Sequence, residues 1–324
     1  MKKIILGIIS SFLIFASCSK DDSDCSVTQP EAVPAPALIT PRIDVRMADP
    51  LNQSAFTGVL EVYPCTGESS IYYGNYVNGK LSVFNGYYTI VNGVVSGEYN
   101  RELHLPTGDY NMVYWGTPQY QDQIDTDPQI VSPGLIQGAD LSKLYFSLRS
   151  IGNNLYSPVF DLVYAVKSAH IGTDALQAAL TRISAGLKLN VKQTDGSPFI
   201  SEIASFKVNI GNIAEKINFY TAEVVNMTKT VQFELERSSD GMTYSNPTVM
   251  LFPSAANPPL ELLITLEDGT EYNLTQNLNS TLSSNTMLTL NINVGTILAD
   301  GNPGDFTLDD WNESSETIDF PTVN

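Results

Sequence analysis

Strict alternation of apolar and polar residues is the feature of this sequence that most restricts its fold. Between residues 182 and 192 every second side chain is apolar, namely Ile183, Ala185, Leu187, Leu189 and Val191. A two-residue period places successive side chains on opposite faces of an extended strand, so this segment predicts a half-buried β-strand. The same period returns at 206–210, 231–235 and 288–294. We therefore expect an all-β chain.

Turn dipeptides separate the predicted strands at short intervals. They are Asn78-Gly79, Asn85-Gly86, Asn92-Gly93 and Asp268-Gly269. Such pairs favour tight hairpins because both central residues of the turn can adopt positive φ. Hairpins are expected at 87–95 and 260–274, and residues 174–180 can form one or two helical turns. Strand spacing predicts two β-sandwich domains, residues 42–170 and 171–324.

One predicted strand, within residues 101–116, has bulky side chains on both faces. Tyr110, Met112 and Tyr114 alternate with Val113 and Trp115 after a turn at 106–109. A strand of this kind belongs in a sandwich interior or beside a covering loop.

The N-terminus has the layout of an export signal over residues 1–17. Lys2 and Lys3 precede an apolar run from Ile4 to Ala16, which is shorter than the roughly 20 residues of a membrane-spanning helix. The stretch 15–18, Phe-Ala-Ser-Cys, resembles a bacterial lipobox. On that resemblance Cys18 becomes the mature N-terminus, and acyl chains such as palmitate anchor it to the outer membrane. The alternative is a secreted protein with a cysteine near its cleavage site.

Residues 18–41 are expected to form a tether. The acidic run 19–24 resembles the surface-export signal of lipoproteins in bacteria of the Bacteroides kind, although a solvated acidic spacer is the alternative. The following residues 26–41 contain four prolines, which favour a stiff, extended conformation. The tether would hold the folded part of the chain away from the membrane, facing outward.

Composition argues against some partners but does not decide whether the cysteines form a disulfide. The 324 residues are 43% hydrophobic and 16% charged, with a formal net charge of −18. A sizeable core is therefore possible, and the negative charge argues against a nucleic-acid partner. Besides Cys18 there are Cys25 and Cys65, which can form one disulfide in an exported protein or stay as two free thiols.

No motif points to catalysis, a cofactor or a metal. Zinc-ligand spacing, a phosphate loop and a nucleophile elbow are all absent from the sequence, and His104 and His170 belong to no motif. Asp309-Asp310 imitates a glycosidase pair, but adjacent carboxylates on an extended chain point apart. The acidic stretch 122–127 lacks the glycine and terminal glutamate of an EF-hand. We expect a protein that is not an enzyme.

Three features occur in order along the chain: the lipoprotein signal with its acidic run, LPTGDYNMVYWG at 105–116, and ALTRISAGLKLNV at 179–191. The second is similar to the L-P-x-G-x-Y-x-x-x-x-W-G stretch of FimB-like anchors. The third is similar to the L-x-R strand that opens the second domain of those proteins. Together they resemble the fimbrillin family of type V pili, whose members are shaft, anchor and tip subunits.

The resemblance implies two tandem transthyretin-like β-sandwiches that join other pilin subunits by strand exchange. In such exchange a protease removes an N-terminal strand after an arginine, and the C-terminal strand of a neighbour fills the groove. On this chain Arg42 or Arg46 would be the processing site, and Ile318 and Phe320 would be the donor-strand plugs. Pro321 departs from an ideal donor strand. Exposed strand-edge residues are the alternative for both arginines, and an anchor would stay uncut.

We therefore expect a cell-surface fimbrial subunit, an anchor or accessory one that supports adhesion. The alternative is a surface lipoprotein that binds a glycan or host ligand as a pilus tip adhesin. Exposed aromatic residues such as Tyr114, Tyr120 or Trp311 would mark that function, although Tyr114 also suits core packing. A free tail at 314–324 would favour strand donation, whereas a tail docked on its own body would favour a terminal or self-capped subunit.

Overall fold

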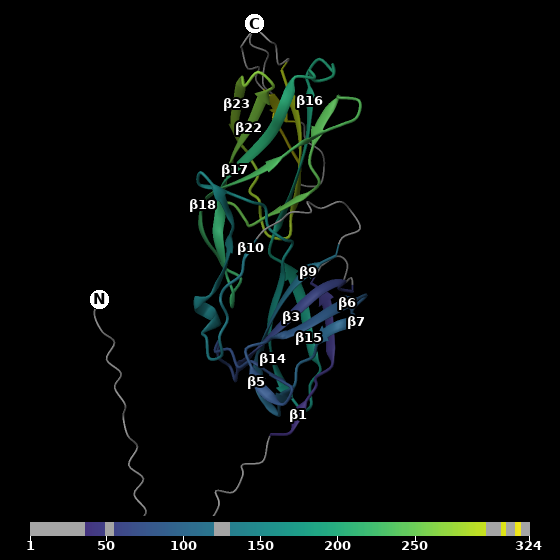
Figure 1. Cartoon of the computed structure of the whole chain (residues 1–324), viewed down its shortest axis with the longest axis vertical. Coiled ribbons are helices and arrows are strands. Elements are labelled where there is room, and N and C mark those ends of the chain that lie inside the picture. The colour runs from purple at the N-terminus through teal and green to yellow at the C-terminus, as the bar shows by residue number, and fades with distance from the viewer. Residues whose placement is uncertain (1–35, 49–54, 120–129, 296–305, 309–314, 319–324) are drawn as a thin grey trace, which may run out of the picture. The chain divides into compact units, whose positions relative to one another are not determined.

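The computed structural model describes residues 36–48, 55–119, 130–295, 306–308 and 315–318, the last two segments by their main chain only. The export signal, Cys18, Cys25 and the tether up to residue 35 lie outside these residues. Strands make up most of the part described (Figure 1), with one short helical element, the 3-10 turn η1 (Leu141–Lys143). The predicted all-β class is confirmed.

The first sheet has seven strands. In spatial order they are β2 (Ile43–Met47), β15 (Leu176–Arg182), β14 (Val163–Ile171), β9 (Gly108–Pro118), β3 (Gly58–Thr66), β6 (Gly86–Val91) and β7 (Val94–Arg101). All neighbours are antiparallel except β2 and β15, which are parallel. Two small antiparallel pairs, β1 (Leu38–Ile39) with β8 (Leu105–Pro106) and β4 (Asn75–Val77) with β5 (Lys80–Ser82), lie outside this sheet.

This sheet curls so that β2 and β15 cover the inner face of the other strands. Val45 of β2 and Leu176 of β15 share one buried cluster with Leu60 of β3 and Tyr114 of β9. The curl begins where β14 and β15 separate, because these two strands pair only at 163–164 and 181–182. The result is a sandwich whose smaller layer consists of β2 and β15.

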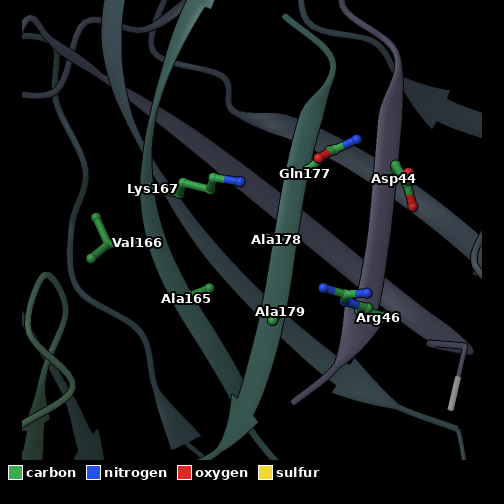
Figure 2. Close-up of a pocket in the computed structure, with 8 residues that line it drawn as sticks. All are labelled: Asp44, Arg46, Ala165, Val166, Lys167, Gln177, Ala178 and Ala179. Carbon is green, nitrogen blue, oxygen red and sulfur yellow. The ribbon is translucent and has the colours of Figure 1, made fainter. Parts of the chain in front are cut away.

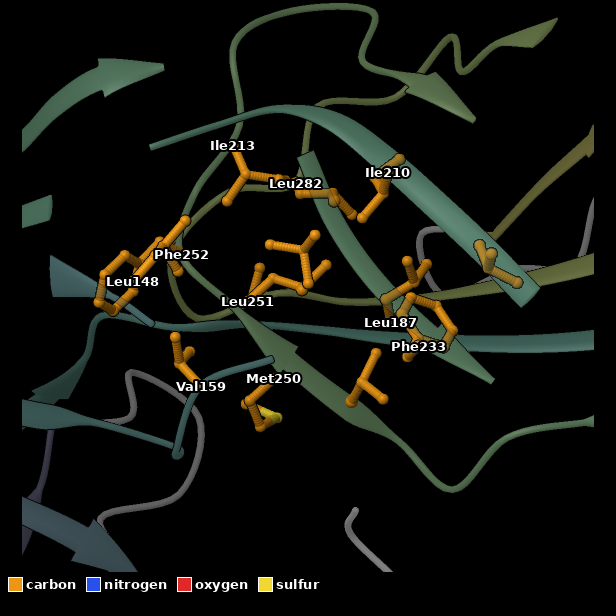
Figure 3. Close-up of a cluster of buried hydrophobic side chains, with 14 of the residues drawn as sticks. Leu148, Val159, Leu187, Ile210, Ile213, Phe233, Met250, Leu251, Phe252 and Leu282 are labelled. Atoms are coloured by element: carbon orange, nitrogen blue, oxygen red, sulfur yellow. The ribbon is translucent and has the colours of Figure 1, made fainter. Parts of the chain in front are cut away.

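Two further sheets enclose a second, larger core. The eight-stranded sheet contains β10 (Ile130–Val131), β11 (Tyr145–Leu148), β17 (Ile203–Asn218), β18 (Val224–Glu234), β13 (Leu155–Tyr156), β12 (Ser150–Gly152), β22 (Pro259–Leu266) and β23 (Glu271–Asn277). The seven-stranded sheet contains β19 (Glu236–Arg237), β20 (Thr243–Ser245), β16 (Ala185–Gln193), β24 (Met287–Val294), β25 (Phe306–Leu308), β21 (Val249–Leu251) and β26 (Ser315–Ile318). Their inner faces meet in the cluster of Figure 3, where Leu187 of β16 lies near Phe233 of β18.

Strand β9, expected in a sandwich interior or beside a covering loop, contacts both cores. Tyr110, Met112 and Tyr114 belong to the first cluster, whereas Val113 and Trp115 belong to the second. The Trp115 Nε1 also donates a hydrogen bond of 2.9 Å to the carbonyl oxygen of Phe219, which follows β17. One strand of the first sheet is thereby packed against the second sandwich.

The strands do not divide at the expected boundary of 170/171. Residues 176–182 are a strand of the first sheet, with Leu176, Ala178 and Leu180 facing its core, so the helical turn considered there is wrong. Residues 130–156 instead supply β10 to β13 of the eight-stranded sheet. The tether also ends earlier than residue 41, because β1 at 38–39 already pairs with β8.

Most of the predicted turns form. Asn92 and Gly93 both have positive φ and join β6 to β7, and Asp268-Gly269 joins β22 to β23. The turn expected at Asn85-Gly86 is wrong, because neither residue has positive φ and Gly86 is the first residue of β6. A side chain at Gly86 would come within 2.7 Å of Leu103. This glycine is needed for close packing.

Replacing Gly93 with alanine is expected to lower the free energy of unfolding by about 1 kcal/mol, because an L-residue is strained at its φ of +78°. The added methyl group would make only ordinary contacts, 3.5 Å from Ala55 and Val45. Urea denaturation measures the change. Gly134→Ala is the matched control, since that position is open and has no positive φ; equal losses for both variants would contradict the backbone explanation.

Candidate functional site: the exchangeable edge strands

Strand β2 is an edge strand held mainly by one neighbour. Residues 43–47 pair in parallel with 176–180 of β15, and two flanking hydrogen bonds join the Leu176 N–H to the Arg42 carbonyl and the Ala48 N–H to the Leu180 carbonyl, at 2.7 and 2.8 Å. Ile43 and Val45 point into the first core and are 8% and 1% exposed. Withdrawal of β2 would remove two core side chains and leave the polar edge of β15 without its partner.

The other side of β2 borders a depression rather than a hydrogen-bonded strand. Beyond a single bridge between Arg46 and Ala55, β2 faces β7 across a hollow of about 660 Å³. The hollow is lined by β2 residues, by Tyr88 of β6, by Glu102 and by the first residues of β7. This flank of the sandwich is therefore open beside β2.

Both predicted processing residues lie at β2. Arg42 immediately precedes the strand, Arg46 lies within it, and both side chains are exposed. Their main chain is nevertheless paired with β15. The Arg42 carbonyl accepts a hydrogen bond from the Leu176 N–H, and Arg46 is in register with Ala179. A protease needs an accessible extended segment, so cutting here would require β2 to leave the sheet first.

The C-terminal segment is paired with the strands of its own chain. Residues 315–317 of β26 lie in parallel with 289–291 of β24, and β25 pairs with 292–294 of the same strand. Ile318 is the last residue of β26, whereas Phe320 lies outside the described residues. Of the segment expected to donate a strand, residues 315–317 are therefore paired with their own chain.

Cys65 is a free thiol with no exposed surface. Burial raises the pKa of this thiol to about 12. Cys25, its expected partner, lies outside the described residues, so the disulfide stays a prediction. Such a bond would require the tether to enter the core.

The two histidines have separate hydrogen-bond partners. The exposed His170 Nδ1 lies 2.7 Å from Asp109 Oδ1, and His104 is half-buried, with its main-chain N–H donating to Asn75. Residues 122–127, Asp309 and Asp310 lie outside the described residues. No group of three or more potential metal ligands occurs in the part of the chain that is described.

Of the three aromatic residues proposed for ligand binding, the structure describes Tyr114 alone. Tyr114 has no exposed surface and belongs to the first core, so it is not part of a binding platform. Burial raises its pKa above the usual value. Tyr120 and Trp311 lie outside the described residues.

A buried ion pair, not singled out in the sequence, lies where the first sheet leads into the second sandwich. Arg182 Nε donates to both carboxylate oxygens of Asp161, at 3.0 and 3.1 Å, and the side chain of Asp161 is 2% exposed. The Ser184 hydroxyl donates to the same carboxylate and accepts the Leu162 N–H. Nothing in the sequence links Arg182 to Asp161, because their contact depends on the tertiary fold.

Strands near both ends of the described chain, β2 and β26, each pair with a single neighbouring strand, β15 and β24. A family model described as "Fimbrillin-A associated anchor proteins Mfa1 and Mfa2" matches residues 23–317, and the chain belongs to this family. It is a fimbrial subunit of the anchor or accessory kind. No helix in the described part is long and apolar enough to span a membrane.

Solved structures share the fold at low sequence identity. The fimbrial anchor protein Mfa2 from Porphyromonas gingivalis matches with a TM-score of 0.50 and 14% identity, covering 87% of this chain and all of that one. A candidate adhesin from Bacteroides ovatus matches with a TM-score of 0.53 and 10% identity, covering 88% and 96%. No curated protein matches the sequence.

Proposed function

We propose that this subunit is anchored to the outer membrane through a lipid on Cys18 and joins a neighbouring pilin by accepting its strand in place of β2. The observation that carries the proposal is the position of β2, an edge strand bonded to β15 on one side and open on the other. Parallel pairing is slightly less stable per residue than antiparallel pairing, which favours displacement. The incoming strand would restore the edge bonds and fill the places of Ile43 and Val45.

The docked C-terminal segment supports a terminal position. Because β26 pairs with β24 of its own chain, it would have to leave that strand before it could enter another subunit. A subunit that accepts a strand without donating one ends a fibre. This argument favours an anchor over a shaft subunit.

Lipidation and cutting have opposite consequences for such an anchor. A cut after Arg46 would separate Cys18 from the folded part of the chain, leaving only the non-covalent pairing of β2. We therefore propose that the tethered form stays uncut and that the displaced β2 remains attached. Arg42 and Arg46 would serve as processing sites only in a released form.

Replacing Cys18 with serine is expected to move the protein from the membrane fraction to the soluble fraction. The substitution removes the site of the acyl chains, several of which are needed for firm attachment. Immunoblots of fractionated cells and incorporation of labelled palmitate provide the measurement. Cys65→Ser is the control, since that thiol is buried in the folded chain. Membrane retention and labelling of Cys18→Ser would contradict the lipid anchor without bearing on strand exchange.

The tip-adhesin alternative has less support. It depended on exposed aromatic side chains, and Tyr114 is buried. The alternative would be favoured if the protein bound a glycan on an array and Tyr120→Ala abolished that binding. If the protein bound no glycan on the array, the anchor would remain the better explanation.

A further inference from the structure

A depression borders β2, β15 and β14 and is distinct from the hollow between β2 and β7. It holds about 390 Å³ and is lined by eight residues, four of them polar: Asp44, Arg46, Lys167 and Gln177. A second depression of about 330 Å³ adjoins it and shares Lys167 and Gln177. Each lies within the size range of small-molecule sites, which starts at about 300 Å³.

The depression exists because β14 and β15 separate. Beyond the pairs at 163–164 and 181–182, no main-chain pairing joins the two strands, although each stays paired with its other neighbour. The residues that border the resulting gap are small, namely Ala165, Ala178 and Ala179, although the Ala178 side chain itself faces the first core. They leave a shallow apolar floor between polar walls.

The polar walls combine positive charge with hydrogen-bond acceptors. Figure 2 shows Lys167 extending from β14 toward β15, while the guanidinium of Arg46 points to the same space from β2. Asp44 and Gln177 are register partners on adjacent strands, and both are exposed. Arginine and lysine suit a carboxylate, whereas the oxygens of Asp44 and Gln177 accept hydrogen bonds from hydroxyl groups.

We propose that this depression binds an acidic sugar residue of the hexuronate class. Its carboxylate lies between Lys167 and Arg46, its hydroxyl groups donate to Asp44 and Gln177, and one face of its ring covers the alanine floor. An acidic peptide fits less well, because Asp44 and the nearby Asp174 would repel a run of carboxylates. Two of the four polar residues come from β2, so the site is complete only while β2 is in place.

The test is calorimetric titration of the full chain with methyl β-glucuronide. Methyl β-glucoside, sodium acetate and triglutamate are the comparison probes for a neutral ring, a lone carboxylate and an acidic peptide. Lys167→Gln is expected to weaken glucuronide binding about tenfold, the effect of losing one charge-assisted hydrogen bond. Lys192→Gln is the matched control, an exposed strand lysine on β16, and binding by it should equal that of the unchanged chain.

The expected result is that glucuronide binds at least tenfold more tightly than the three comparison probes. Thermal melting of Lys167→Gln should match that of the control, which separates lost binding from lost folding. The proposal is overturned if glucuronide shows no binding at millimolar concentration, if Lys167→Gln binds it as well as the unchanged chain does, or if triglutamate binds more tightly. The titrations contain no pilin, so β2 stays in place and their outcomes do not test its exchange.

Discussion

Replacing Asp161 with alanine is expected to lower the free energy of unfolding by about 3–5 kcal/mol. The carboxylate is buried and accepts hydrogen bonds from Arg182 and Ser184. Its removal leaves the guanidinium, whose side chain is 26% exposed, without the charge that lies beside it. The loss is large because breaking a buried pair costs more than the pair contributes as a whole.

Chemical denaturation of the variant measures this loss. The matched control is Lys143→Ala, which breaks a surface pair of 3.4 Å between Lys143 and Asp140 in which the lysine is 81% exposed. Exposed pairs contribute at most about 1 kcal/mol. If Asp161→Ala costs no more than this control, the ion pair does not stabilise the junction.

Replacing Trp115 with alanine is expected to lower the free energy of unfolding by a similar amount, about 3–5 kcal/mol. The ring is 1% exposed and packs edge-on against Phe146, with a centroid distance of 4.9 Å. It also packs against Tyr164 and Phe219 and donates its N–H to the Phe219 carbonyl. The substitution opens a cavity where β9 meets the second core.

Two variants test this explanation by denaturation. Trp115→Phe keeps an aromatic ring but leaves the Phe219 carbonyl without its donor, so its loss should lie between zero and that of alanine. Tyr99→Ala removes an aromatic side chain that is 87% exposed and should change the free energy by no more than about 0.5 kcal/mol. Equal effects of Trp115→Ala and Tyr99→Ala would contradict the packing described for β9.

Local patterns predicted the strands well, because side-chain alternation is set by neighbours in the sequence. The period at 182–192 became β16, in which Ala185, Leu187, Leu189 and Val191 are buried. The two bulky faces of β9 predicted an interior position, whereas its contact with two separate cores is set by the tertiary fold. The helical turn considered at 174–180 was wrong because Ala175 and Ala179 stand where a strand pattern would have polar residues, and alanine favours helix.

The pairing of distant strands could not be predicted from the same patterns. The parallel contact of β2 with β15 joins residues more than 120 positions apart, and nothing in either strand encodes its partner. The docking of β26 on β24 depends equally on the tertiary fold. The depression near Lys167 was missed because it results from the separation of β14 and β15, whereas the small residues at 165, 178 and 179 look unremarkable in sequence.

The central claim is that a pilin strand displaces β2, and a disulfide that locks β2 to β15 tests it most directly. Val45 and Ala178 are register partners on β2 and β15, and the variant Val45→Cys/Ala178→Cys places two thiols where a disulfide can lock the strand. The measurement is binding of a purified pilin subunit from the same fimbriae, by size-exclusion chromatography, to the oxidised and the reduced variant. Ala178→Cys alone is the control for oxidation.

The account predicts that the reduced variant binds the pilin, that the oxidised variant does not, and that the control binds under both conditions. Equal binding by the oxidised and reduced double variant would contradict the exchange of β2.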